Sequence, residues 1–335
     1  MIMKKFINDP ENLTVELLEG LATAYPQKVK VVDPKVVVRA TPKSEDKVAV
    51  ITLGGSGHEP ALSGFVGEGL LDASVVGDIF AAPNAVAVSK ALEMFNRPAG
   101  ILLIILNHAG DIMSAKMAMK MAAKKGVNVK SIMVSDDISA GLDAAIEDRR
   151  GLAGSVLLAK VVGAAAEEGK SLDEIIEIGE KFNARIATLA VAMTGCTHPQ
   201  TGGAISELGD DEMEIGMGQH GEAGGSRSKI LTAAETAKSM FGNLSASLKL
   251  TAGEKIYVMM NGVGATTPME LAVVLKNVKE EAAAIGVEVI GGMIDEILTV
   301  QEMAGFQMII GVVDEVSQKY VYAKSNAPYW TSLGE

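Results

Sequence analysis

The segment AGILLIIL, residues 99–106, decides the fold class of this 335-residue chain. It is apolar at consecutive positions, which is typical of a strand buried on both faces of a sheet. Similar short aliphatic runs occur at residues 35–40, 47–53, 73–80 and 131–135. Segments of helical length and composition separate them, at residues 83–95 and 112–125. This alternation predicts an α/β fold with a mostly parallel sheet and helical crossovers.

The second half of the chain returns to the same alternation. Two consecutive helices are predicted first, at residues 151–169 and 171–184. Strands are then predicted at residues 185–193, 212–218, 255–262, 287–294 and 306–313, with helices near 228–241 and from Thr267. We therefore expect two α/β domains with mostly parallel or mixed sheets flanked by helices, over residues 1–184 and 185–335.

The amino-acid composition excludes several kinds of binding partner and structural class for this chain. The formal net charge is −12 and no Lys/Arg-rich block interrupts the sequence, so neither a nucleic acid nor an anionic membrane is an expected partner. Cys196 is the single cysteine, which excludes an intrachain disulfide framework and a multi-cysteine metal site. No apolar run approaches the roughly 20 residues of a membrane span. We expect a cytoplasmic protein with small-molecule or protein partners.

Histidines mark the candidate functional loops. The chain has four, and each lies just past the carboxyl end of a predicted strand: His58, His108, His198 and His220. Ligands bind at that edge in open α/β sheets, because the loops there carry side chains that the strands position. Three of these loops also combine glycines with titratable groups: GGSGHEP, NHAGD and GMGQHGEAGG. The alternative is that the histidines are surface-loop residues without a role.

The turn GGSGHEP, residues 54–60, allows more than one interpretation. Its glycines let the backbone approach a phosphate or another polar molecule, but the lysine of a P-loop is absent. Ser56 resembles a hydrolase nucleophile only loosely. His58 is either a ligand-handling group or a turn residue. A zinc site built from the four histidines lacks any supporting ligand spacing.

Asp111 and His220 are the other candidates for chemistry. Asp111 starts the methionine-rich helix, where it acts either as a helix cap or as a general base. His220 lies between glycines after a strand of alternating pattern. Its side chain is not needed for packing there, and this favours a catalytic or ligand-binding role. The methionines of residues 112–125 are interpreted as core-filling residues rather than as a partner groove.

With these residues identified, the chain resembles the dihydroxyacetone kinase K subunit family over nearly its whole length. The matching segments include GGSGHEPALSGFVGEGLLDA, GILLIILNHAGDIM, LGDDEMEIGMGQHGEAGG and NGVGATTPMEL. The resemblance implies a homodimer in which His220 binds the substrate ketone covalently as a hemiaminal. It also implies that Asp111 helps to remove the proton of the attacking hydroxyl, and that His58 is a second proton acceptor or a hydrogen-bond partner. The residues implied to surround the substrate are Gly55, Ser56, Gly57, His58 and Asp111.

The resemblance also implies that the substrate and the nucleotide bind to different subunits. This chain is expected to bind no cofactor or metal itself. ADP or ATP with Mg is expected on a separate L-type nucleotide-binding subunit, which a multiphosphoryl M-type protein rephosphorylates in the phosphotransferase-linked form. The substrate class implied is a small ketose.

Several positions depart from the family pattern. Leu106 stands where a substrate-contacting lysine is usual, Ala81 and Ala82 replace a Thr-Ser pair, and Leu53 replaces a first glycine. These departures indicate a short ketose or aldose other than dihydroxyacetone. The alternative is a non-catalytic paralogue that senses a ligand and regulates a partner protein.

Overall fold

A computed structural model describes residues 5–218, 222 and 224–334 of the chain. The chain divides into two compact units. Of the described residues, the N-terminal unit contains 5–134, 155–183 and 315–334. Of the described residues, the C-terminal unit contains Ser135–Gly154 and Ala184–Asp314. The chain thus passes between units near residue 184, where the sequence predicts a boundary, and also near residues 134, 154 and 314.

Two short segments, residues 315–334 and 135–154, each belong to a unit whose other residues lie far away in the sequence. Buried polar contacts attach each segment to its unit. The fully buried Lys160 donates to the carbonyl oxygens of Tyr320 and Ala323, at 2.8 and 2.7 Å, and so fixes the final segment to the N-terminal unit. Burial lowers the pKa of Lys160 to about 8. In the C-terminal unit, the hydroxyl of Thr188 donates to the carboxylate of Asp136. Each segment therefore satisfies a buried polar group of its unit.

The sheet of the N-terminal unit is mixed. Its strand order is β1-β2-β4-β3-β5-β6. The strands are β1 (Val29–Asp33), β2 (Val36–Arg39), β3 (Ala49–Ser56), β4 (Ala73–Ile79), β5 (Ile101–Leu106) and β6 (Val129–Val134). Pairs β3–β4, β3–β5 and β5–β6 are parallel, whereas β1–β2 and β2–β4 are antiparallel. The predicted strands are present, and β1 is an addition that the sequence reasoning missed.

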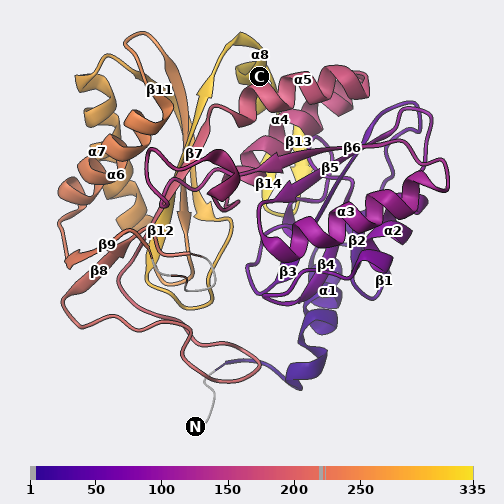
Figure 1. The fold of residues 1–335 in the computed structure, drawn as a ribbon, viewed down its shortest axis with the longest axis horizontal. Helices are drawn as coiled ribbons and strands as arrows, with labels where there is room; N and C mark the ends of the chain where they lie inside the picture. Colours follow the sequence, from indigo (N-terminus) through magenta and orange to yellow (C-terminus); the bar gives the residue numbers. More distant parts are fainter. Residues whose placement is uncertain (1–4, 219–221, 223, 335) are drawn as a thin grey trace. The chain divides into compact units, whose positions relative to one another are not determined.

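Helices cover this sheet. They are α1 (Leu13–Ala24), α2 (Ala85–Met94), α3 (Ala109–Ala123), α4 (Gly154–Glu168), α5 (Leu172–Asn183) and α8 (Glu315–Tyr322), followed by the hairpin β13 (Ser325–Ala327) and β14 (Trp330–Ser332). Figure 1 shows α2 and α3 side by side, and both contribute to one core cluster with β3, β4 and β5. Every residue of β5 is buried, as the apolar run predicts.

The methionine-rich helix α3 packs differently from the prediction. Its buried core residues are Ala115, Ala118 and Ala122, whereas Met113 and Met117 are exposed. Small alanine side chains let α3 approach the sheet and α2 closely, which leaves no room for long side chains on that face. The interpretation of the methionines as core-filling residues is therefore wrong for these two positions.

The C-terminal unit contains a second mixed sheet, in which antiparallel pairs dominate. Its order is β11-β10-β12-β7-β8-β9. The strands are β7 (Ile186–Ala192), β8 (Glu212–Ile215), β9 (Ser226–Lys229), β10 (Lys255–Gly262), β11 (Glu288–Glu296) and β12 (Gly305–Val313). Only the β10–β11 pair among them is parallel in the part of the chain that the structure describes.

Helices α6 (Ala233–Leu248) and α7 (Pro268–Ala284) lie side by side against the second sheet (Figure 1). Both begin with a capping box, in which a threonine and a glutamate satisfy backbone N–H groups reciprocally. The box of Thr267 and Glu270 confirms the helix start predicted there. Within the described residues, no helix combines the length and the apolar character needed to cross a membrane.

Two helix glycines give a matched test of packing in the N-terminal unit. A Cβ at Gly163 of α4 would lie 2.4 Å from the carbonyl oxygen of Leu70, whereas a Cβ at Gly20 of α1 would meet nothing within 4 Å. We expect Gly163→Ala to lower the free energy of unfolding by about 1–3 kcal/mol, because the helix must move away. Gly20→Ala should raise it by about 0.5–1 kcal/mol, because alanine favours the helix. Chemical denaturation measures both, and equal effects would contradict this account.

Candidate functional site

The turn after β3 is glycine-rich because it packs against the turn after β4. A Cβ at Gly55 would lie 2.8 Å from the backbone nitrogen of Ala81, and a Cβ at Gly57 would lie 2.7 Å from the ring of Phe80. Gly57 also has a φ of +98°, which side chains disfavour. The Phe80 N–H donates to the carbonyl oxygen of Ser56 at 2.8 Å. These glycines are therefore required for close packing before any ligand is considered.

The Ser56 side chain is engaged inside the unit. Its hydroxyl lies 2.8 Å from the Thr14 hydroxyl and donates to the carbonyl oxygen of Gly77 at 3.1 Å. The residue is fully buried. The weak hydrolase interpretation of Ser56 thus finds no support, and Ser56 can offer a ligand only its backbone.

His58 and Asp111 follow two neighbouring strands. Because β3 and β5 are parallel, with Thr52 opposite Ile104, their carboxyl ends lie at the same edge of the sheet. His58 is 5% exposed, and its ring lies 4.9 Å from that of Phe80. Asp111 is 8% exposed and lies in the first turn of α3, where the helix dipole favours a carboxylate.

The cap position of α3 belongs to His108, not to Asp111. Asp111 lies in the first turn and is therefore not the N-cap residue. Its nearly buried carboxylate follows the strand next to that of His58, and its role as a general base stays a prediction. His108 makes no side-chain cap hydrogen bond.

A partly buried carboxylate holds the histidine turn. The N–H of Gly57 donates to both oxygens of Glu59, at 3.1 and 3.0 Å. Desolvation raises the pKa of Glu59 to about 7, against the lowering effect of these backbone hydrogen bonds. Sequence reasoning missed this role of Glu59, although the residue lies inside the GGSGHEP motif.

In the C-terminal unit, the loop that carries His220 follows β8. His220 itself lies outside the described residues. The ends of its loop are joined, because the Gly218 N–H donates to the carbonyl oxygen of Glu222 at 2.9 Å. Gly216 has a φ of +93°, and a Cβ at Gly224 would lie 2.5 Å from the carbonyl carbon of Gly216. The glycines around His220 thus allow the two sides of the loop to pack backbone against backbone.

Arg150 anchors this loop, and sequence reasoning did not identify it. Its Nε donates to Asp137 Oδ2 at 2.7 Å, and its Nη2 donates to the Ser139 hydroxyl at 2.7 Å and to the Gly216 carbonyl oxygen at 2.8 Å. Its Nη1 lies 3.7 Å from Glu222 Oε2. One guanidinium therefore contacts both sides of the loop. The available signal was an acidic pair and two arginines within the segment DDISAGLDAAIEDRR.

The strands that precede His198 and His220 do not end at a common edge of the sheet. Strands β7 and β8 are antiparallel, so their carboxyl ends point in opposite directions. His198 lies in a loop of its own, where its Nδ1 accepts a hydrogen bond from the Gln200 N–H at 3.2 Å. Across residues 5–218, 222 and 224–334, no group of three or more His, Cys, Asp or Glu side chains is arranged to hold a metal ion.

The positions that depart from the family pattern lie in different environments. Leu53 is fully buried and belongs to the core cluster under α2 and α3, so its side chain does not select a ligand by contact. Leu106 is the last residue of β5, one position before the loop that leads to Asp111. The backbone of Ala81 packs against Gly55. Of these departures, Leu106 lies nearest to Asp111 along the chain.

The fold and loops define an α/β protein of two sheet-based units, with histidines in glycine-rich loops at strand ends. The Dak1 domain model matches residues 19–329, and the chain belongs to the Dak1 domain family. The family resemblance and the α/β fold predicted from the sequence are confirmed.

Three relatives show the range of this family. The dihydroxyacetone-binding subunit of a PTS-dependent dihydroxyacetone kinase of Listeria innocua is 40% identical over 308 residues, covering 92% of this chain and 94% of the relative. The L-erythrulose kinase of Pectobacterium atrosepticum is 34% identical over 97% of this chain, which spans 56% of that enzyme. The structure of the dihydroxyacetone kinase operon co-activator Dha-DhaQ superposes with a TM-score of 0.90 at 31% identity, covering 95% and 98% of the two chains. Relatives named as kinases or kinase subunits agree with the predicted enzyme class.

Removing the Glu59 charge tests the raised pKa. The folded state holds the Glu59 proton more tightly than the unfolded state, whose carboxyl has a pKa near 4.5. This stabilising contribution is present below pH 4.5 and is lost as the pH rises towards 7. We expect the free energy of unfolding of the wild type, minus that of Glu59→Gln, to fall between pH 4.5 and 7. A difference that is constant with pH would contradict the assignment.

The anchoring role of Arg150 is testable by amide hydrogen exchange. We expect Arg150→Met to speed exchange at Gly216, Gly218 and Gly225 at least about tenfold, because charge-assisted hydrogen bonds to the loop are lost. Arg149→Met is the matched control, because it removes the neighbouring arginine, whose Nη1 donates to the Ser247 hydroxyl of α6 at 3.5 Å. Unchanged exchange in Arg150→Met would show that other contacts hold the loop.

Proposed function

We propose that this chain is the substrate-binding subunit of a short-ketose kinase. It holds the sugar covalently through His220 and presents a hydroxyl for phosphorylation by a nucleotide-carrying L-type partner. The observation that carries the proposal is the placement of His58 and Asp111, both nearly buried, after adjacent parallel strands of a Dak1 family chain. The homodimer, the M-type partner and the cytoplasmic location stay predictions.

The covalent step follows from the chemistry of imidazole. The unprotonated ring nitrogen of neutral His220 adds to the ketone carbon, the C=O π bond breaks, and the oxygen takes up a proton while the other ring nitrogen loses one. The product is a neutral hemiaminal. A lysine amine would continue to an imine, but the imidazole nitrogen has no second hydrogen to lose. The reaction therefore selects carbonyl compounds over polyols such as glycerol.

The N-terminal unit supplies the groups for phosphoryl transfer. The nearly buried carboxylate of Asp111 takes the proton from the attacking hydroxyl, and His58 is the second acceptor. The backbone of Gly55, Ser56 and Gly57 forms the wall of the sugar site, and Glu59 holds that wall in place. Mg-bound ATP on the partner, supplied as such or formed there by rephosphorylation of bound ADP, would provide the phosphoryl group. Fixing the sugar fixes the direction of attack, and positioning accounts for much of the catalysis in phosphoryl transfer.

The substrate we propose is a short ketose or aldose other than dihydroxyacetone. Leu106 is 5% exposed and apolar where the family pattern has a lysine, so one cation and its hydrogen bonds are missing at the end of β5. The named activity of the L-erythrulose kinase relative is consistent with such variation within the family. An apolar contact at this position favours a sugar that presents a carbon atom there rather than a hydroxyl.

A second candidate function is ligand sensing without catalysis. The structural similarity to the co-activator Dha-DhaQ, with a TM-score of 0.90, favours it, as does the missing lysine. In this case the same adduct would form on His220, and the chain would regulate a partner protein instead of presenting the sugar to a nucleotide.

Intact-mass analysis tests the adduct that both candidates share. After incubation with a panel of short ketoses and aldoses, the wild type should gain the full mass of one sugar without loss of water. His220→Ala should gain nothing, and His198→Ala, which changes another loop histidine of the same unit, should behave as the wild type. If no sugar adds to the wild type, or if His220→Ala gains the same mass, the hemiaminal is wrong.

Reconstitution separates the two candidates. With an L-type subunit and a phosphoryl donor, the kinase should form sugar phosphate, and Asp111→Asn should reduce turnover about 10²- to 10⁴-fold while keeping the adduct. An adduct without sugar phosphate favours the sensor. Unchanged turnover in Asp111→Asn removes Asp111 from the mechanism.

A further inference from the structure

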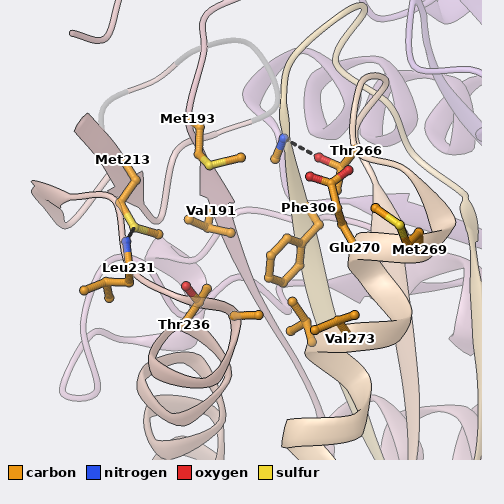
Figure 2. Close-up of a pocket in the computed structure, with 13 residues that line it drawn as sticks. Val191, Met193, Met213, Leu231, Thr236, Thr266, Met269, Glu270, Val273 and Phe306 are labelled. Carbon is orange, nitrogen blue, oxygen red and sulfur yellow. Dashed lines mark hydrogen bonds between the residues drawn. The ribbon is translucent and has the colours of Figure 1, made fainter. Parts of the chain in front are cut away.

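The C-terminal unit contains a cavity of about 290 Å³ between the first turns of α6 and α7 and the edge of its sheet. Figure 2 shows Met193 and Met213 on one side of this cavity and Met269 on the other, with the ring of Phe306 between them. Val191 completes the sheet side. None of these residues has a part in the proposed sugar chemistry.

The cavity extends into the core of the unit. Val191, Phe306 and Val274 line it and also belong to the main hydrophobic cluster of the second sheet. At the mouth, Met269 is 72% exposed and Val273 is 49% exposed. The apolar surface is thus continuous from solvent to core. An unfilled apolar space of this size is unfavourable for folding, because its lining atoms lack partners.

Two polar groups of the lining already bond to other parts of the protein. The Thr266 hydroxyl accepts from the Gly305 N–H at 2.7 Å, and Glu270 accepts from the hydroxyl of Thr267 at 2.7 Å (Figure 2 marks the first of these). Most of the other lining residues are apolar, so a sugar, with a hydroxyl on nearly every carbon, would lose most of its hydrogen bonds to water here. The lining therefore suits hydrocarbon.

Charge at the mouth restricts the ligand further. Hydrogen bonds from the Thr267 side chain and backbone lower the pKa of Glu270, so this carboxylate is ionised at neutral pH. An anionic head group beside it would be repelled. The methionine side chains that line the space are flexible and polarisable, which suits ligands of varied shape.

We propose that this cavity binds an uncharged small molecule that is mostly hydrocarbon. A dry cavity of about 150 Å³ holds one benzene molecule, so the space here matches a ligand of about ten to twelve non-hydrogen atoms. The volume and depth exceed what one side chain of a flat protein partner would fill. The site is separate from the sugar chemistry, and its occupation does not require His220.

A homologous series of primary alcohols tests the ligand class. Calorimetric titration of the full chain with 1-hexanol through 1-dodecanol should show affinity rising about fourfold per added CH₂. The rise should stop once the chain is longer than the cavity. Octanoate at pH 7 should bind at least tenfold more weakly than 1-octanol. Affinity that does not depend on chain length, or octanoate that binds equally well, overturns the proposal.

Two neighbouring alanines locate the site. Ala233, the first residue of α6, lines the cavity, whereas Ala234 is exposed and does not. Ala233→Leu should weaken 1-octanol binding at least tenfold, while Ala234→Leu should bind as the wild type. Val273→Phe, at a half-exposed position of the mouth, should also weaken binding and serves if Ala233→Leu fails to fold. Equal affinity in the wild type and both blocking variants overturns the site.

His220→Ala keeps this proposal distinguishable from the proposed function. The variant should bind 1-octanol with unchanged affinity even though it forms no sugar adduct. If 1-octanol does not bind and Ala233→Leu instead changes the oligomeric state, the cavity is an interface between protein chains and the small-molecule proposal is wrong.

Discussion

Close backbone packing between the turns after β3 and β4 is the constraint on which the candidate site depends. Gly77 lets the turn after β4 fold back on its own strand, because a Cβ there would lie 1.9 Å from the carbonyl oxygen of Ala81. A Cβ at Gly55 would lie 2.8 Å from the backbone nitrogen of Ala81, and a Cβ at Gly57 would lie 2.7 Å from the Phe80 ring, so a side chain at either glycine would push the two turns apart. Because His58 follows Gly57 directly, this contact determines where the imidazole lies at the edge of the sheet. The glycine-rich sequence, first considered as a possible phosphate cradle, is better explained by this contact.

Much of the fold could be predicted because strands buried on both faces leave a strong signal. The run at 99–106 became β5 with every residue buried, and the capping box at Thr267 began α7 as expected. The sequence carries no comparable signal for which strands pair with one another. The sequence therefore did not show that β12 pairs antiparallel with both β7 and β10, or that the last segment of the chain joins the N-terminal unit. That attachment depends on Lys160 reaching two carbonyl oxygens that are remote in sequence.

The contrast between local sequence signals and contacts between remote residues also explains which candidate site residues could be predicted. His58 and Asp111 were identified because a strand's carboxyl end can be located from local sequence, and the parallel pairing of β3 with β5 confirms their common edge. Arg150 was missed because its role consists of contacts to Gly216 and Glu222, more than sixty residues away. Leu53 was overinterpreted for a related reason, since sequence position did not show that its side chain faces the core.

Carboxylates that accept backbone N–H groups are a recurring device in both units. Glu59 holds the Gly57 N–H, Glu214 holds the Gly224 N–H, and Asp136 holds the N–H groups of two residues at the start of α4. Each carboxylate loses hydration on burial, and the hydrogen bonds offset part of that cost. For Glu59 and Asp136 the offset is incomplete, because desolvation still raises their pKa values to about 7 and about 6. Part of the acidic excess of the sequence therefore fixes loop backbones. Acidification towards pH 6 should therefore protonate Glu59 and begin to protonate Asp136, which relieves the cost of burying their charges.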